Sequence, residues 1–129
     1  MIAKFSEEKA MANGGAAGSR GYIFQAVIAL IECLEKDRDW DAIKNEPATE
    51  EDKVDIMLYK EGKTVSAIQV KSSLYPFGKK EVEEWLGKLR GDAKEAEEVC
   101  LCLVGDKFTK GCGDFIKANP AEIKTVSFE

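Results

Sequence analysis

The fold of this chain depends on residues 46–71, which read EPATEEDKVDIMLYKEGKTVSAIQVK. Two β-rich runs, residues 53–59 and residues 64–71, flank the tripeptide EGK at 61–63. A short connection that contains glycine is typical of a β-hairpin. We therefore predict that this stretch forms two antiparallel strands, and the other elements are expected to pack around them.

The predicted hairpin gathers polar groups on one face. Side chains alternate along a strand, so Gln69 and Lys71 share one face of the second run, and Ile68 and Val70 point the other way. Directly paired residues point the same way, so a register that groups the aliphatic residues also groups Asp55 with Gln69 and Lys71. A three-residue loop predicts Asp55 opposite Gln69, with Cβ atoms about 5 Å apart, and Lys71 as a diagonal neighbour. A carboxylate, an amide oxygen and an ammonium group would then converge.

This pattern resembles a known enzyme superfamily. An acid early in one strand, Gln-x-Lys in the next and Glu46 upstream are similar to the Q-x-K form of the PD-(D/E)XK nucleases. Residues 14–25, GGAAGSRGYIFQ, also resemble the start of nuclease effector domains in bacterial antiphage defence systems, including those tied to cyclic-oligonucleotide signalling. The resemblance covers residues 14–104. It departs from the pattern at Val54, where the proline of the superfamily name is missing, and at Gln69, which replaces the commoner acidic ligand.

The resemblance implies a site for Mg²⁺ or Mn²⁺ at the hairpin. Magnesium prefers oxygen ligands and keeps several waters. The implied ligands are the Asp55 carboxylate, the Gln69 amide oxygen, the Val70 backbone carbonyl and, as a second acid, Glu46. Lys71 would orient or deprotonate the attacking water, or offset charge in the transition state.

Two further residues are secondary candidates for the site, and two lysines are candidates for binding nucleic acid. Asp52 is included because an acid pair often precedes this strand in relatives of this type, and Gln25 because it would support the hairpin from the first helix. Lys79 and Lys80 stand at the start of a predicted helix, where the helix dipole disfavours cations. That cost suggests a use for the two lysines in contacting phosphate.

A plain structural interpretation of the same residues stays open. The polar face of the hairpin would then simply face water, with Lys71 and Asp55 forming a cross-strand ion pair. The acids at residues 50–52 would be a solvated loop, which is the usual fate of a charge run.

The amino-acid composition excludes several catalytic mechanisms. The chain has 129 residues, enough for one domain with one core, and no histidine. Mechanisms based on Ser-His, Cys-His or histidine-bound metal are therefore excluded, leaving carboxylates, lysines and a cation. The four cysteines lack zinc-finger spacing, so we interpret them as small apolar residues or surface thiols.

The charge pattern indicates how tightly this domain would bind nucleic acid. The net charge is −5, but residues 64–91 hold five cations against three glutamates. Because nucleic-acid affinity comes mostly from neutralising phosphates, we expect this domain alone to bind nucleic acid weakly, with DNA favoured. A homo-oligomer or additional domains of a longer multidomain protein would then supply affinity.

The remaining patterns give the predicted architecture. Residues 1–19 are expected to be a flexible arm and residues 20–129 a nuclease-like domain. Predicted helices cover residues 22–34, 79–96 and 108–118, and further strands cover 42–46, 98–104 and 124–128. This order predicts an α/β fold, a restriction-endonuclease-like mixed sheet flanked by helices in the order αβββαβ(αβ).

No apolar run approaches the ~20 residues that a membrane span needs, and no signal-peptide core is present. We therefore expect a cytoplasmic protein with no membrane partner. The predicted function is a Mg²⁺-dependent endonuclease acting in bacterial defence. Two alternatives remain on the same fold: a non-catalytic nucleic-acid or protein interaction module, and a Holliday-junction resolvase-like enzyme, suggested by Arg20-Gly21 but disfavoured by the acidic charge.

Overall fold

The computed structural model describes residues 23–29, 31–32, 39–45, 47, 49 and 53–127. The predicted arm, residues 1–19, lies outside this part. Residues 23–29 and 31–32 are helical. The elements that follow are β1 (Ala42–Asn45), β2 (Ile56–Lys60), β3 (Lys63–Ser72), α3 (Lys79–Asp92), β4 (Glu98–Val104), α4 (Lys110–Ala118) and β5 (Ile123–Val126).

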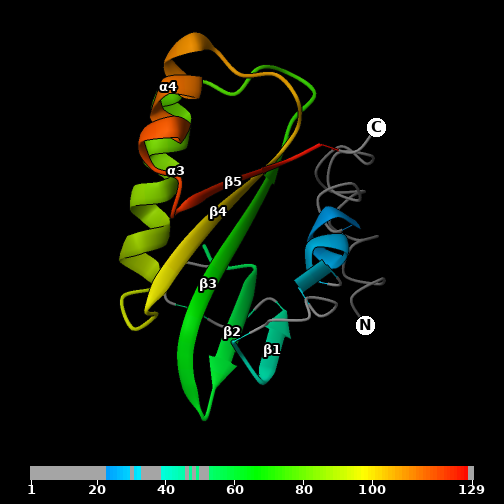
Figure 1. Cartoon of the computed structure of the whole chain (residues 1–129), viewed down its shortest axis with the longest axis vertical. Helices are drawn as coiled ribbons and strands as arrows, with labels where there is room; N and C mark the ends of the chain where they lie inside the picture. The colour runs from blue at the N-terminus through cyan, green and yellow to red at the C-terminus, as the bar shows by residue number, and fades with distance from the viewer. Residues whose placement is uncertain are drawn as a thin grey trace.

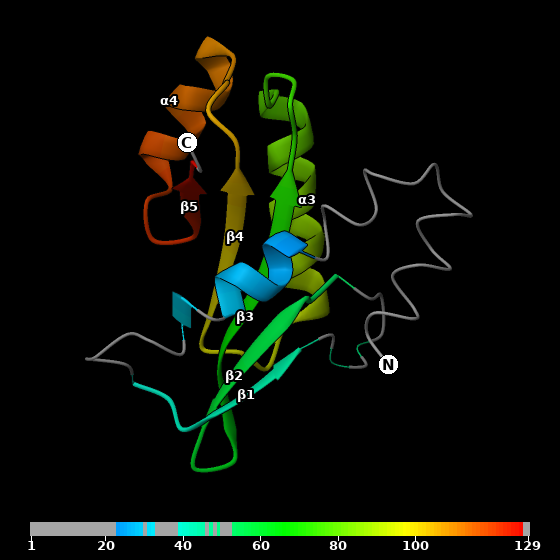
Figure 2. The same ribbon diagram turned by 90° about the vertical axis from the view of Figure 1, so that its right-hand side faces the viewer.

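The strands form one mixed sheet in the order β1-β2-β3-β4-β5. The pairs β1–β2 and β2–β3 are antiparallel, whereas β3–β4 and β4–β5 are parallel. The ten-residue β3 serves both halves, and α3 and α4 make the crossovers between the parallel strands (Figure 2). The predicted α/β class with a mixed sheet flanked by helices, and the element order αβββαβ(αβ), are confirmed for the described residues.

Helices cover both faces of the sheet. Figure 1 shows α3 and α4 on one side and the helical residues 23–29 and 31–32 on the other. The core on the α3 side includes Ala67, Leu86 and Leu101, and the opposite core includes Ile28 and Ile68. Residues 101–104 of β4 are all buried, as expected for a continuous apolar strand covered on both faces.

The hairpin is built differently from the prediction but reaches the same register. Glu61 and Gly62 both have positive φ, 51° and 81°, so they form a two-residue turn instead of a three-residue loop. Lys60 pairs with Lys63, but the register shifts at a bulge, and Leu58 pairs with Ser66. Val65 is the extra residue, and it restores the offset that a three-residue loop would have given.

Four other sequence predictions need correction. The strand predicted over residues 53–59 is Ile56–Lys60, so Asp55 precedes it. Helix α3 ends at Asp92 rather than at residue 96, because the next five residues turn the chain back to the sheet, where the Glu97 N–H donates to the Thr64 carbonyl. Helix α4 starts after Thr109, whose hydroxyl accepts from the Cys112 N–H. The last strand is Ile123–Val126, which begins and ends earlier than predicted.

The cysteines in the described part of the chain are buried or partly buried, which explains why their thiols stay protonated. Cys102 and Cys112 are buried and Cys100 is partly buried. Burial raises the pKa of the Cys100 thiol to about 11 and that of Cys102 to about 12. These thiols stay protonated at neutral pH, which suits their interpretation as small apolar residues. Among the described residues, no helix has the length and apolar character needed to cross a bilayer.

Two glycines should respond to alanine in opposite directions. Gly105 has φ of +158°, and a Cβ there would lie 3.0 Å from the Phe77 ring and from the Ser73 carbonyl oxygen. We expect Gly105→Ala to lower the free energy of unfolding by about 1–3 kcal/mol. Gly87 in α3 has nothing within 4 Å of that position, so Gly87→Ala should raise it by about 0.5–1 kcal/mol. Urea unfolding measures both, and a neutral Gly105→Ala would contradict the close approach.

Candidate functional site

Asp55 lies in a bend directly before β2, one residue beyond the last paired position, Ile56 with Ile68. Its backbone N–H donates to the Ile68 carbonyl at 2.8 Å. Its side-chain Oδ2 accepts from the Val70 N–H at 2.7 Å. Asp55 therefore binds the backbone of β3 on both sides of Gln69, and these two bonds fix the carboxylate at the edge of that strand.

Gln69 has an unusual environment. Its side chain is only 6% exposed, and its Oε1 atom has no hydrogen-bond partner within the part of the chain that is described. A buried acceptor left unpaired costs about 1–3 kcal/mol, so most folded proteins avoid one. An amide oxygen is also a ligand that Mg²⁺ accepts. The unpaired oxygen therefore fits the predicted role of Gln69 as a metal ligand.

Lys71 lies on the same face of β3, two residues beyond Gln69. Its Nζ atom is 5.0 Å from the centre of the Trp85 ring, which comes from α3. Burial lowers the pKa of Lys71, the charge of Asp55 opposes this by raising it, and the cations Lys53 and Lys88 lower it further. The ammonium and the Asp55 carboxylate are thus close enough to interact, as the hairpin predicts.

The Val70 carbonyl can be placed from its N–H. In a strand, the N–H and C=O of one residue point to the same edge, as paired residues that exchange both bonds require. Because the Val70 N–H donates to Asp55, the Val70 C=O is also directed to the Asp55 side of β3. The backbone oxygen predicted as a ligand therefore points to the edge where Asp55 lies.

Other predicted site residues lie elsewhere. Gln25 belongs to the helical residues 23–29, which pack on the opposite face of the sheet from Gln69 and Lys71. Glu46 and Asp52 are outside the described residues. The structure thus groups Asp55, Gln69, Val70 and Lys71, and does not bring Gln25 to them.

The two lysines at the start of α3 are both exposed. Lys79 forms an ion pair with Glu83 at 3.5 Å. The cations whose charges act on Lys71 are Lys53 and Lys88 instead.

Sequence reasoning missed a contribution from α3. The Trp85 ring of α3 lies under the Lys71 ammonium. Asp92, the last residue of α3, accepts from the Thr49 hydroxyl at 2.6 Å and from the Lys53 N–H at 2.8 Å. The helix dipole disfavours a negative charge at the C-terminus of a helix. The position of Asp92 was therefore a sequence signal that its carboxylate has a specific partner. Helix α3 therefore fixes the segment leading to Asp55 as well as Lys71.

The donor set suits a hard cation bound with few protein ligands. Among the described residues, no group of three or more His, Cys, Asp or Glu side chains could hold a metal ion. The site offers one carboxylate, one amide oxygen and one backbone carbonyl. Magnesium is commonly held by one or two carboxylates, with waters and substrate phosphate completing its shell, so this set is compatible with it.

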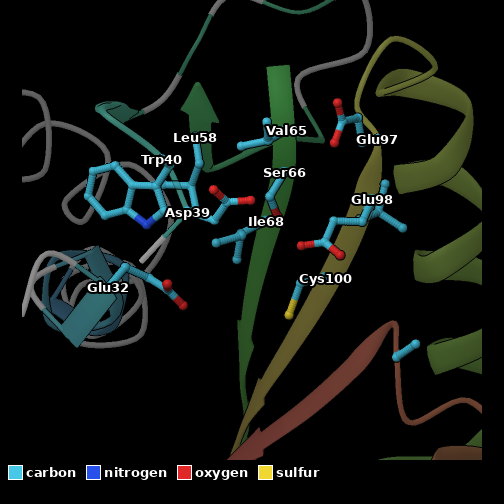
Figure 3. A pocket seen from close by; sticks show the side chains of 12 residues that line it. Glu32, Asp39, Trp40, Leu58, Val65, Ser66, Ile68, Glu97, Glu98 and Cys100 are labelled. Carbon is cyan, nitrogen blue, oxygen red and sulfur yellow. The ribbon is translucent and has the colours of Figure 1, made fainter. Parts of the chain in front are cut away.

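Three cavities in the described part of the chain are lined by residues other than Asp55, Gln69 and Lys71. A cavity of about 450 Å³ lies on the opposite face of the sheet, beside Trp40. Figure 3 shows the carboxylates that line it, which belong to Glu32, Asp39, Glu97 and Glu98. These charges repel a polyanion, so nucleic acid is expected to bind elsewhere.

Comparisons with known proteins add little. No protein-family model matches this chain, and no curated protein matches it significantly. Among solved structures, a repair endonuclease from Pyrococcus abyssi aligns with a TM-score of 0.44 and 15% sequence identity. The alignment covers 78% of this chain and 45% of that chain, so this chain spans less than half of that protein. A likeness at this TM-score does not indicate what this chain does.

The coupling between Asp55 and Lys71 can be measured. Asp55→Asn keeps an acceptor for the Val70 N–H but removes the charge that raises the pKa of Lys71. We expect the Lys71 pKa, already below 10.5, to fall further in this variant. Titration of the Lys71 Cε signal by NMR reports it, with Asp114→Asn in α4 as the control. An unchanged or higher Lys71 pKa in Asp55→Asn would show that the two groups are not coupled.

Proposed function

We propose that this domain is a metal-dependent nuclease that hydrolyses phosphodiester bonds, with DNA as the favoured substrate. The observation that supports it best is the buried, unpartnered Gln69 Oε1 on the face of β3 that also carries Lys71. Asp55, bonded to the adjacent Val70 N–H, supplies the carboxylate. A simple water-facing hairpin does not account for a polar atom that is neither wet nor paired.

The roles of the residues follow from their positions. A bound Mg²⁺ or Mn²⁺ ion supplies activation of water and stabilisation of the departing oxygen. Asp55, Gln69 and the Val70 carbonyl would hold that ion. Lys71 reaches its neutral form at a lower pH than an ordinary lysine, because burial lowers its pKa, and it could then accept a proton from the attacking water. In its charged form it would offset the negative charge of the transition state.

Glu46 and Asp52 remain proposals as additional acids. Glutamine carries no charge, so Gln69 should bind a cation less tightly than the glutamate found more often at this position. A second carboxylate from the segment before β2 would compensate.

We also propose that the domain acts as an effector in bacterial defence. This proposal rests on the resemblance of residues 14–25 to the start of such nuclease domains. The net charge of −5 means that a homo-oligomer or further domains would have to supply most of the affinity for nucleic acid.

One observation favours a second candidate, a non-catalytic nucleic-acid-binding module on the same fold. Within the described residues, Asp55 has no cluster of further metal-binding side chains around it. Failure of both Mg²⁺ and Mn²⁺ to bind the intact chain, in isothermal titration calorimetry, would favour this candidate over the nuclease.

Loss of either central residue should abolish cleavage. We expect Asp55→Ala and Lys71→Ala to remove Mg²⁺-dependent cleavage of a fluorescent DNA substrate, because one loses the carboxylate ligand and the other the amine. Lys94→Ala, an exposed lysine beyond the end of α3, should cleave like the wild type. Circular dichroism checks that all three variants fold. Cutting at the wild-type rate by either site variant would remove the proposed mechanism.

Replacing Gln69 by glutamate should make the Tm of the domain depend more strongly on Mg²⁺. Without metal, Gln69→Glu buries a second acid near Asp55, so we expect a lower Tm than for the wild type. With Mg²⁺, the added charge should tighten binding and give a larger rise in Tm than in the wild type. Thermal unfolding with and without Mg²⁺ measures both effects. Equal Tm shifts in the two proteins would indicate that Gln69 is not a ligand.

A further inference from the structure

Two loops run side by side at the carboxyl ends of β3 and β4 (Figure 2). Residues 73–78 lead from β3 into α3, and residues 105–109 lead from β4 into α4. Phe77 forms an isolated parallel bridge with Phe108. Backbone bonds of 3.0 Å join the Phe77 N–H to the Lys107 carbonyl and the Thr109 N–H to the Phe77 carbonyl. The two loops therefore form one fixed surface.

The tip of the first loop is apolar and exposed. Leu74 is 66% exposed and Tyr75 is 79% exposed, while Phe77 just beyond them is only 1% exposed. The Phe77 ring stacks on Phe108 at 5.5 Å between centroids and meets the edge of Trp85 at 6.1 Å. The Tyr75 N–H also donates to the Ser73 hydroxyl at 3.0 Å. The anchored loop thus holds two large side chains in water, which points to a partner.

The same surface is basic in an acidic protein. Residues 71–80 and 105–111 carry five lysines and one aspartate, in a chain of net charge −5. The lysines are Lys71, Lys79, Lys80, Lys107 and Lys110. Two acids just beyond these ranges reduce the positive charge: Glu83 pairs with Lys79, and the Glu81 carboxylate accepts from the Gly78 N–H at 3.2 Å. A polyanion is the partner that complements this charge.

A cavity of about 310 Å³ lies beside the tip. It is lined by the side of Leu74, by Lys107 and by the hydroxyl-bearing Ser72, Ser73 and Ser127, among others. Its volume is at the lower end of the range for small-ligand sites. Ser72 directly follows Lys71, so this cavity and the candidate site are at the same end of β3, although Phe24 and Val104 place the cavity on the face opposite Gln69 and Lys71.

We propose that the paired loops bind a single-stranded segment of nucleic acid, with Tyr75 stacking on an unpaired base and Lys80, Lys107 and Lys110 neutralising phosphates. A base can stack on a side chain only when it has left its own stack, so an exposed tyrosine favours single strands, flaps or frayed ends over intact duplex. This inference rests on the proposed function for its link to cleavage. The loops would deliver a single-stranded segment to Asp55 and Lys71.

Binding can be tested apart from cleavage. Fluorescence anisotropy in EDTA, with the full chain and a labelled oligonucleotide, compares a single strand with a blunt duplex of the same sequence. We expect tighter binding to the single strand. Tyr75→Ala should weaken that binding about tenfold, and Tyr75→Phe should restore it because the ring is kept. Equal binding by Tyr75→Ala and the wild type would overturn the proposal.

Salt dependence tests the lysines. Lys107→Gln should reduce the slope of log affinity against log salt concentration by about 0.7, the value for one phosphate contact on a single strand. Lys94→Gln, which removes the same charge at the far end of α3, should leave the slope unchanged. The same loss of slope in both variants would overturn the assignment, since net charge alone would then explain it.

The result is independent of the nuclease proposal. Because anisotropy in EDTA reports binding without cleavage, Tyr75→Ala should weaken binding of the single strand whether or not the wild type cleaves it. Binding that needs Tyr75 in a protein that never cleaves would support the surface and contradict the nuclease. A Tyr75→Ala variant with an altered oligomeric state and normal oligonucleotide binding would instead identify the tip as a contact between copies of the chain.

Discussion

The site depends on the register between β2 and β3, which a single extra residue sets. A two-residue turn at Glu61 and Gly62 would by itself pair Ile56 with Ala67, and a slip of one residue exchanges the two faces of a strand. The bulge at Val65 corrects the offset, so Ile56 pairs with Ile68 and their side chains share the core opposite α3. Asp55 then meets the edge of β3 that carries the candidate ligands. The hydrophobic pattern and the polar site are consequences of the same alignment.

Helix α3 is the second support of the site. Its Trp85 ring lies under the Lys71 ammonium, and its last residue, Asp92, holds the segment that leads to Asp55. The two central groups of the site are therefore positioned from one helix, although Asp55 comes from the bend before β2 and Lys71 from β3. The buried Gln69 oxygen between them has no described protein partner, and its cost in the free domain is consistent with a group kept for binding.

Much of this could be predicted from the sequence, because alternation and apolar runs specify faces directly. The element order and the offset that places Asp55 beside Gln69 followed from such patterns. The route to that offset did not, since a turn with Glu61 at positive φ and a compensating bulge has no simple sequence signal. The contacts of Trp85 and Asp92 were also missed, because they join residues 14 to 43 positions apart and depend on how α3 packs. Glu46 and Asp52 remain predictions.

The charges of the domain are separated along β4. The carboxylates of Glu97 and Glu98 stand where this strand begins, in the wall of the acidic cavity, and the lysine-bearing loops stand where it ends. Seven residues of strand separate the two ends by about 20 Å, which exceeds the Debye length of about 8 Å at physiological salt. A polyanion at one end is therefore screened from the other. Under the proposed function, the lysine-bearing end and not the acidic end would meet the phosphate chain, so the net negative charge would not by itself prevent binding.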